Sequence, residues 1–342
     1  SLYLGSTLKI SQTVYFTCDT RSFDMSSTKQ TFLTLNNGGK MPALGLGTFM
    51  SPPEEVEKAV TWAIEAGYRH IDCAAFYQNE PAVGSALNKA IQNGLIKRED
   101  IFITSKLWCS EHRAKDVRPA CEGSLKRLGL EYLDLYLVHW PVSFKIKPNV
   151  QFSKDDPDCL EYEDVPLEET WAAMEDLVDA RLVKSIGVSN FNKSQIERLL
   201  KMCRIKPAVN QIEVSVNWMN SKMVEYAKSK DIKVTAYAPF GSPVFIRDTA
   251  IPSPLQEEYV VKIAQAHGKT PAQVLLRHAL QRGLIVIPGS INAGRIRQNI
   301  DVFDFELTEE EMRILNTSGK NVRLFSIPCI ANHPEYPFND EY

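Results

Sequence analysis

The stretches IFITSK at residues 101–106 and LDLYLVHW at residues 133–140 are the most informative part of this sequence about the fold. Each is a short apolar run, which is typical of a strand buried on both faces of a parallel sheet. A third such run, RHIDCAAFY, spans residues 69–77. Side chains capable of acid/base chemistry stand at or just beyond the ends of the three runs: Asp72, Tyr77, Lys106 and His139. Because the pocket of a parallel barrel forms at the C-terminal ends of its strands, we expect three separate segments to supply one site.

Strand-like segments recur along the rest of the chain. Residues 31–44 predict a hairpin, because the Asn-Gly and Gly-Gly pairs between TFLTL and KMPAL favour a tight turn. Eight strand-like runs then follow: ALGLGT (43–48), HIDCA (70–74), FITSK (102–106), LDLYLVH (133–139), KSIGVS (184–189), AVNQIE (208–213), KVTAYAP (233–239) and LIVIPGS (284–290).

Amphipathic segments separate these runs, with apolar residues spaced by three and four as in helices. Examples are residues 52–67, 81–94, 118–129, 167–181 and 221–230. Eight strands with covering helices predict a (β/α)₈ TIM barrel of the α/β class. The count of strands and the absence of a GxGxxG turn after the first strand disfavour a doubly wound sheet. We expect one barrel domain over residues 29–342.

Two segments are longer than the connections that a minimal barrel needs. The loop from Pro141 to Pro166 has no predicted secondary structure, and the chain after Leu307 holds one helix (TEEEMRILN, 308–316) and an irregular tail to Tyr342. Long loops without secondary structure are usually functional in compact domains. We expect both segments to form walls of a pocket.

Composition excludes several classes of function. A net charge of -3 with interspersed signs argues against nucleic acid or an anionic membrane as a partner. Seven scattered cysteines without C-x-x-C spacing or clustered histidines give no support to a metal site, and they suggest free thiols in a reducing, cytoplasmic compartment. No apolar stretch is long enough to span a membrane. Residues 1–28 are polar, lack the pattern of a secretory signal, and are expected to form a disordered extension.

The four acid/base residues suit one chemistry when they are brought together. A tyrosine is a weak acid with a pKa near 10, but a neighbouring ammonium favours the phenolate, so Lys106 is expected to lower the pKa of Tyr77. Asp72 would keep a buried lysine charged, and His139 could donate a hydrogen bond to a carbonyl oxygen. Such a set suits proton donation to an oxygen that gains negative charge, as in carbonyl reduction.

Simpler interpretations stand beside this one. Each residue alone is more often structural, Asp72 could pair with Arg69, and Trp108 and Trp140 could be core aromatics. A glycosidase would need two carboxylates that face one cleft, with Glu80 or Glu213 as the partner of Asp72.

At these residues the sequence resembles the aldo-keto reductase family, most closely its aldose reductase branch. The matching motifs are GLGTF (45–49), GYRHIDCAAFYQNE (67–80), ITSKLW (103–108), YLDLYLVHWP (132–141), GVSNFN (187–192), PAVNQIE (207–213), TAYAPFGSP (235–243) and VFDFELT (302–308). The resemblance covers residues 31–342. It implies a barrel that binds NADPH without a Rossmann domain and reduces aldehydes and some ketones to alcohols.

The resemblance also implies roles for individual residues. Tyr77 would be the general acid, Lys106 and Asp72 the pair that adjusts its pKa, and His139 the residue that orients the substrate carbonyl. The cofactor would contact Thr48, Asp72, Ser189, Asn190, Gln211, Tyr237, Gly241, Ser242, Ser290, Asn292, Arg295, Gln298 and Asn299. The substrate would contact Phe49, Phe76, Trp108, His139, Trp140, Phe144, Phe325 and Ile327.

Departures from the family pattern lie mainly around the cofactor. Gly289 stands where a lysine usually meets the adenosine phosphate, and Val244 and Met50 replace a charged pair that closes over the pyrophosphate. We therefore expect faster cofactor release and a weaker preference for NADPH over NADH, with NADH as a weaker or second cofactor, although Arg295 remains for the 2′-phosphate. Ala238 and Phe240 replace the usual Ser and Leu, and Phe325 stands where relatives often carry cysteine.

Three functional hypotheses remain from the sequence. The first is a monomeric reductase of small-molecule aldehydes, and the second is a reductase of ketosteroids or other bulky ketones. The third, from another class, is a binding or structural barrel without catalysis. The intact set of four acid/base residues argues against the third.

Overall fold

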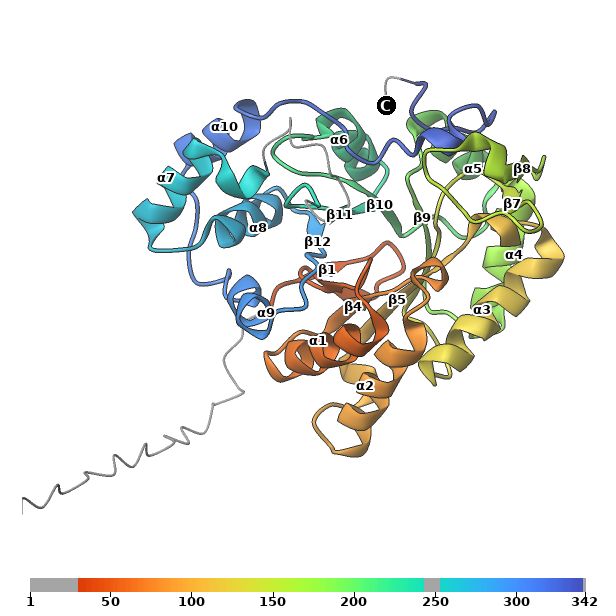
Figure 1. Ribbon diagram of the computed structural model, residues 1–342, viewed down its shortest axis with the longest axis horizontal. Helices are drawn as coiled ribbons and strands as arrows, with labels where there is room; N and C mark the ends of the chain where they lie inside the picture. Colours follow the sequence, from red (N-terminus) through yellow and green to blue (C-terminus); the bar gives the residue numbers. More distant parts are fainter. Residues whose placement is uncertain (1–29, 243–252, 341–342) are drawn as a thin grey trace, which may run out of the picture.

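An eight-stranded parallel sheet forms the centre of the computed structural model, which describes residues 30–242 and 253–340 (Figure 1). The predictions for residues 1–28 and for Val244 concern positions that lie outside the described residues. The strands are β3 (Leu46–Gly47), β4 (His70–Asp72), β5 (Phe102–Leu107), β6 (Leu135–Val138), β9 (Ile186–Ser189), β10 (Val209–Glu213), β11 (Lys233–Tyr237) and β12 (Ile285–Val286). Each matches one of the eight predicted runs.

The sheet closes on itself between its first and last strands. Parallel bridges join Leu44 to Val286 and Gly47 to Gly289. The backbone N–H of Gly45 donates to the carbonyl of Val286 at 2.8 Å, and that of Gly47 to the carbonyl of Pro288 at 3.1 Å. Gly47 is required here, because a Cβ would lie 2.7 Å from the carbonyl oxygen of Ile287. The predicted (β/α)₈ barrel is confirmed.

Helices form a ring around the barrel (Figure 1). They are α1 (Pro53–Glu65), α2 (Glu80–Gln92), α3 (Ala114–Leu128), α4 (Leu167–Asp179), α5 (Lys193–Met202), α6 (Ser221–Ser229), α8 (Pro271–Gln281) and α9 (Ala293–Ile300). Those from α1 to α5 and from α8 through α9 to α1 pack on their neighbours. Two further helices, α7 (Glu258–His267) and α10 (Glu309–Thr317), pack outside this ring. None of the helices among the described residues is long and apolar enough to cross a membrane.

Local sequence sets several helix ends. The side chains of Asn192 and Thr270 accept hydrogen bonds from backbone N–H groups at the starts of α5 and α8, each as part of a capping box with a glutamine. Helix α3 ends at Gly129, whose φ of 66° suits the left-handed residue that terminates a helix.

The predicted N-terminal hairpin is β1 (Phe32–Thr34) and β2 (Lys40–Pro42), which pair antiparallel. Leu35 and Met41 pack in one buried cluster with Phe102, Leu135 and Val209, which stand at or near the starts of barrel strands. The hairpin therefore covers the N-terminal end of the barrel and leaves the C-terminal end for a site.

The loop over residues 141–166 was expected to have no secondary structure, and this prediction is wrong. It contains a two-stranded antiparallel sheet of β7 (Phe144–Ile146) and β8 (Leu160–Tyr162). The tail after α10, blue in Figure 1, runs past α6 to this small sheet, where the Tyr162 hydroxyl donates to the carbonyl of Cys329 at 2.8 Å. Loop and tail thus support each other at one end of the barrel.

Candidate active site

Four side chains from three strands meet at the C-terminal end of the barrel. Lys106 on β5 donates from Nζ to Asp72 Oδ2 at 2.6 Å, to the carbonyl of Cys73 at 2.8 Å and to the Tyr77 hydroxyl at 3.1 Å. Asp72 ends β4, and Tyr77 lies in the short 3₁₀ helix Ala75–Tyr77 that follows. The His139 ring, directly after β6, lies 5.8 Å from the Tyr77 ring between centroids. The three sequence segments do supply one site.

Burial dominates the electrostatics of this cluster. It raises the pKa of Tyr77 to about 12, although Lys106 acts in the opposite direction. Lys106 does lower the pKa of Tyr77, as expected, but the loss of solvation outweighs the nearby ammonium and the net shift is upward. Burial alone would lower the pKa of Lys106, but the Asp72 carboxylate and Tyr77 raise it. At neutral pH the pair is consequently a neutral phenol beside an ammonium.

His139 is neutral in this environment. Burial and the charge of Lys106 hold its pKa well below the ordinary value. Its Nδ1 atom is buried and has no hydrogen-bond partner among the described residues. Its carbonyl oxygen accepts from Asn190 Nδ2 at 3.0 Å, which fixes the backbone at the end of β6. A neutral imidazole keeps one N–H donor.

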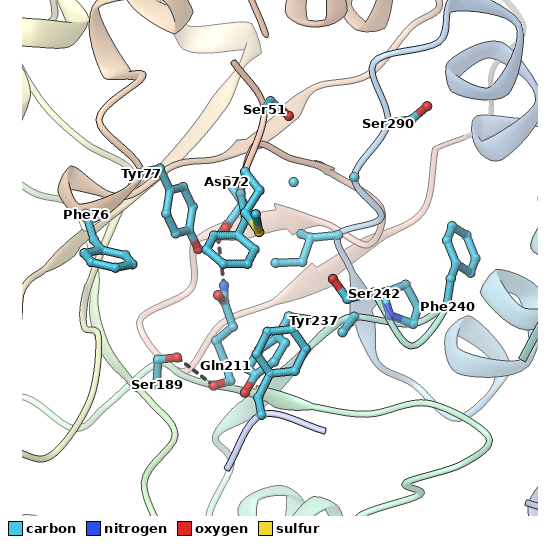
Figure 2. Close-up of a pocket in the computed structure, with 18 of the residues that line it drawn as sticks. Ser51, Asp72, Phe76, Tyr77, Ser189, Gln211, Tyr237, Phe240, Ser242 and Ser290 are labelled. Atoms are coloured by element: carbon cyan, nitrogen blue, oxygen red, sulfur yellow. Dashed lines mark hydrogen bonds between the residues drawn. The ribbon is translucent and has the colours of Figure 1, made fainter. Parts of the chain in front are cut away.

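A cavity of about 710 Å³ opens above these residues and is lined by Asp72, Tyr77 and His139. Lys106 lies beneath it, fully buried. In Figure 2, Phe76 and Tyr77 lie on one side of the cavity, and Phe240 and Ser290 lie on the other. The cavity is thus continuous from the acid/base cluster to the segment after β12.

Apolar and aromatic side chains line the end of the cavity near Tyr77. All the predicted substrate residues are among them: Phe49, Phe76, Trp108, His139, Trp140, Phe144, Phe325 and Ile327. The rings of Phe76 and Trp108 stack with centroids 3.9 Å apart. Trp108 and Trp140 therefore face the cavity and are not merely core aromatics.

Sequence reasoning missed other residues at this end. Phe152, Lys154 and Ile330 also line the cavity. The Phe152 ring lies 5.5 Å from that of Phe76 between centroids and nearly parallel to that of Phe144. Phe152 could have been predicted, because it is an aromatic residue in the loop 141–166 that was expected to form a wall of the pocket.

Polar side chains continue the cavity beyond Tyr77. Ser189 donates to the carbonyl of Gln211, and Gln211 Nε2 donates to Asp72 Oδ1, both at 2.8 Å (Figure 2). The Tyr237 hydroxyl donates to Asn190 Oδ1 at 2.8 Å. This network joins the ends of β9, β10 and β11 to Asp72 and holds the lining side chains in place.

The far end of the cavity lies at the start of α9. Ser290, Asn292, Arg295, Gln298 and Asn299, which were expected to contact the cofactor, line the cavity there, and Ser242 lines it too. Asn292 caps the helix by accepting from the Arg295 backbone N–H at 3.0 Å. A helix N-terminus with an arginine nearby favours an anionic group such as phosphate. Leu255 and Thr270 also line the cavity, and no sequence pattern had indicated either residue.

Two predicted cofactor residues do not line the cavity. Thr48 is buried and donates to the carbonyl of Asp72 at 2.9 Å, so it supports the cluster from below. Gly241 has a φ of 74°, and a Cβ there would lie 2.9 Å from Pro254. Gly241 therefore allows a backbone conformation and a close approach to Pro254 that a larger residue would not.

The positions that depart from the family pattern also lie at the cavity. Gly289 and Met50 both line it. A Cβ on Gly289 would lie 3.3 Å from the carbonyl oxygen of Gly47 and would meet no other described atom within 4 Å outside its chain neighbours. A side chain at Gly289 therefore fits after a small shift.

The alternative roles of Asp72 find no support in the structure. Arg69 donates to the carbonyls of Ile64 and Tyr68 and not to Asp72. Glu80 accepts from Ser105 and Arg127, away from the cavity. Glu213 accepts from backbone N–H groups of the tail. A pair of carboxylates that face one cleft is therefore not formed with either glutamate.

Comparisons with known proteins agree with this geometry. The model of the Aldo/keto reductase family matches residues 43–319. Aldo-keto reductase family 1 member A1-A of Danio rerio is 44% identical over 91% of this chain and 99% of its own, and human family 1 member C1 is 46% identical over 90% and 97%.

Solved structures show the same likeness. The aldose reductase from Schistosoma japonicum is 51% identical with a TM-score of 0.84, covering 91% of this chain and 100% of its own. A Bombyx mori aldo-keto reductase in complex with NADP is 42% identical with a TM-score of 0.82, covering 90% and 99%. The chain therefore belongs to the aldo/keto reductase family of oxidoreductases.

Proposed function

We propose that this enzyme reduces aldehydes and some ketones to alcohols with NADPH, with Tyr77 as the general acid. The observation that carries the proposal is the Lys106 ammonium, which bonds to both Asp72 and the Tyr77 hydroxyl beside a largely apolar cavity. A buried phenol held by an ammonium can release its proton when charge develops on a nearby oxygen.

The residues at the cavity fit a nicotinamide dinucleotide. The polar side chains of Ser189, Asn190 and Gln211 would hold the carboxamide, and the Tyr237 ring would stack on the nicotinamide. Ser242 would lie along the pyrophosphate, and the residues at the start of α9, with Arg295, would hold the adenosine phosphate. When bound, the cofactor supplies the hydride. NADP in the Bombyx mori relative supports this choice.

Side chains of the protein carry out the proton transfer. Tyr77 donates its proton to the carbonyl oxygen as negative charge develops there. The Lys106 ammonium stabilises the phenolate that remains, and Asp72 keeps Lys106 charged. A neutral His139 donates a hydrogen bond to the same oxygen and thereby orients the carbonyl.

The aromatic end of the cavity suits apolar carbonyl compounds. Phe76, Trp108, Phe144 and Phe152 offer ring faces and edges there, and aromatic walls favour substrates with apolar bodies. We further propose that the enzyme acts as a cytoplasmic monomer on small molecules and that NADH serves as a weaker cofactor.

An activity screen tests the proposal. Purified enzyme is mixed with NADPH or NADH and a series of aldehydes, aromatic ketones and steroid ketones, and the absorbance of the reduced nicotinamide is followed. Loss of absorbance with aldehydes supports the proposal, and a faster reaction with bulky ketones would move the substrate class to the second hypothesis. Binding of NADPH without turnover of any carbonyl would contradict catalysis.

A further inference from the structure

The buried carboxylate of Glu213 holds the tail of the chain by its backbone. Its Oε1 accepts from the Leu324 N–H at 2.9 Å, and its Oε2 accepts from the Phe325 N–H at 2.9 Å and from the Leu324 N–H at 3.1 Å. Glu213 is the last residue of β10 and is 1% exposed. Both oxygens are therefore committed to two consecutive residues of the tail.

The second of these residues enters the active-site cavity. The Phe325 ring lies 5.3 Å from the Tyr237 ring and 6.4 Å from the Phe49 ring, edge to face in both cases. Phe49 in turn lies 5.1 Å from the ring of Tyr77. Phe325 thus contacts both Tyr237, which is proposed to stack on the nicotinamide, and Phe49, which packs beside the proposed acid Tyr77.

Burial opposes the negative charge that Glu213 carries as a tether. Burial raises the pKa of Glu213, while the Phe325 and Leu324 N–H groups and the charge of Arg323 oppose that rise. A glutamine would fill the same space without the charge. It would, however, place an NH₂ group at the position of Oε1, where it would face the Leu324 N–H donor and lose that hydrogen bond.

The rest of the tail is attached independently of Glu213. The Val322 N–H donates to the carbonyl of Asn217 at 2.7 Å. The Arg323 guanidinium lies over the rings of Trp218 at 4.5 Å and Phe338 at 3.6 Å. A change at Glu213 should consequently release residues 324–325 without detaching the tail.

We propose that Glu213 is a positioning residue that fixes the Phe325 ring in the substrate cavity and thereby sets how well the enzyme accepts bulky apolar carbonyl compounds. The part that concerns substrates rests on the proposed function. Glu213 itself does not line the cavity, and of the two tail residues that it holds Phe325 does, so we assign its influence to Phe325. A ring that is already fixed binds an apolar substrate without the entropic cost of ordering it first.

Glu213→Gln is the central test, and the chain offers a matched control. Glu175 is also a buried carboxylate that accepts from two consecutive backbone N–H groups, those of Arg204 and Ile205, both at 2.7 Å. These residues lie outside the cavity. Both N–H groups bond to Oε1, and a glutamine keeps such an oxygen, so Glu175→Gln removes a buried carboxylate charge and leaves the backbone contacts and the active site in place.

Kinetics with saturating NADPH should separate the two variants. In Glu213→Gln the KM for a bulky aromatic aldehyde should rise about tenfold, while the KM for a small aliphatic aldehyde changes less than about twofold. Glu175→Gln should alter neither. The Glu213→Gln change should vanish in a Phe325→Ala background, because two residues that act as one unit are not additive. An undiminished effect in that background would show that Glu213 does not act through Phe325.

Amide hydrogen exchange provides a readout that does not need turnover. Glu213→Gln should speed exchange in peptides that contain residues 324–325, and Glu175→Gln should leave exchange at residues 204–205 and 324–325 unchanged. Unchanged exchange at residues 324–325 overturns the tether itself. If Glu213→Gln fails to fold, Glu213→Asp, which shortens the reach but keeps the charge, serves in the same experiments. If the wild-type enzyme reduced no carbonyl compound, the proposed function would be refuted. The exchange result would then still decide whether Glu213 holds residues 324–325.

Discussion

The Lys106 ammonium lies 3.1 Å from the Tyr77 hydroxyl, with Lys106 fully buried beneath the cavity and Tyr77 half-buried at its base. Two physical effects compete at this contact. Desolvation disfavours the phenolate, and the ammonium favours it. Desolvation prevails and raises the pKa of Tyr77 to about 12. The contact therefore does not hold a phenolate at neutral pH, and it instead stabilises the charge that appears as Tyr77 gives up its proton.

Tyr77→Phe tests the acid directly. The variant removes only the hydroxyl, so the kcat for aldehyde reduction should fall by roughly 10²-fold or more. NADPH binding, measured by fluorescence quenching, should change little because the ring remains. Wild-type activity in Tyr77→Phe would assign the proton to another donor.

The pH dependence follows from the raised pKa of Tyr77. Reduction requires the protonated phenol, so activity should persist from neutral pH upward and be lost only as the pH rises through the pKa of Tyr77, about 12. Lys106→Met removes the group that lowers this pKa, so the alkaline limb should move still higher. Alcohol oxidation, which requires the phenolate, should rise with pH, and in the variant the rise should extend to higher pH. An unmoved limb means that a group other than Tyr77 titrates.

Stability should respond to the balance of charge beneath the cavity. Lys106→Met leaves the buried Asp72 carboxylate without its ammonium, which should cost about 3 to 5 kcal/mol in the free energy of unfolding. Asp72→Asn combined with Lys106→Met removes both charges and should recover part of that loss. Urea denaturation of the two variants measures the difference. Equal stability of the single and double variants would mean that the ion pair contributes no such coupling.

His139→Gln tests the orientation of the substrate. A residue that bonds the carbonyl oxygen in both the ground state and the transition state should affect KM and kcat together. Because the pKa of His139 lies well below its ordinary value, wild-type activity should show no loss near pH 6 from its protonation. Steady-state profiles of both proteins check this, and a change in kcat alone would contradict the role.

Most of the barrel could be predicted because its strands are continuous apolar runs and its helices have clear periodicity. The short strands β7 and β8 could not, since three residues carry too little pattern to distinguish a strand from a loop. The carboxylate of Glu213 was visible in the sequence, but its role depends on tail residues more than a hundred positions away. The pKa of Tyr77 required the degree of burial, which periodicity does not reveal.

Gly289 tests the placement of the adenosine end of the cofactor. It lines the cavity, at the position where the resemblance to the family implies a lysine. Because the position is exposed, a new ion pair with the 2′-phosphate should contribute only about 0.5 to 1 kcal/mol. Gly289→Lys should therefore tighten NADPH roughly two- to fivefold and leave NADH nearly unchanged.

Gly289→Met is the matched control for this prediction. It places a Cβ in the same contact, 3.3 Å from the Gly47 carbonyl oxygen, and a side chain of similar bulk without charge. Both variants bear any cost of that contact. The difference between their affinities for NADPH therefore measures the effect of the ammonium charge. The gain for NADPH should shrink as ionic strength rises, because an exposed ion pair is screened by salt. If Gly289→Lys tightened NADH as much as NADPH, the lysine would not meet the 2′-phosphate, and the adenosine end would have to lie elsewhere in the cavity.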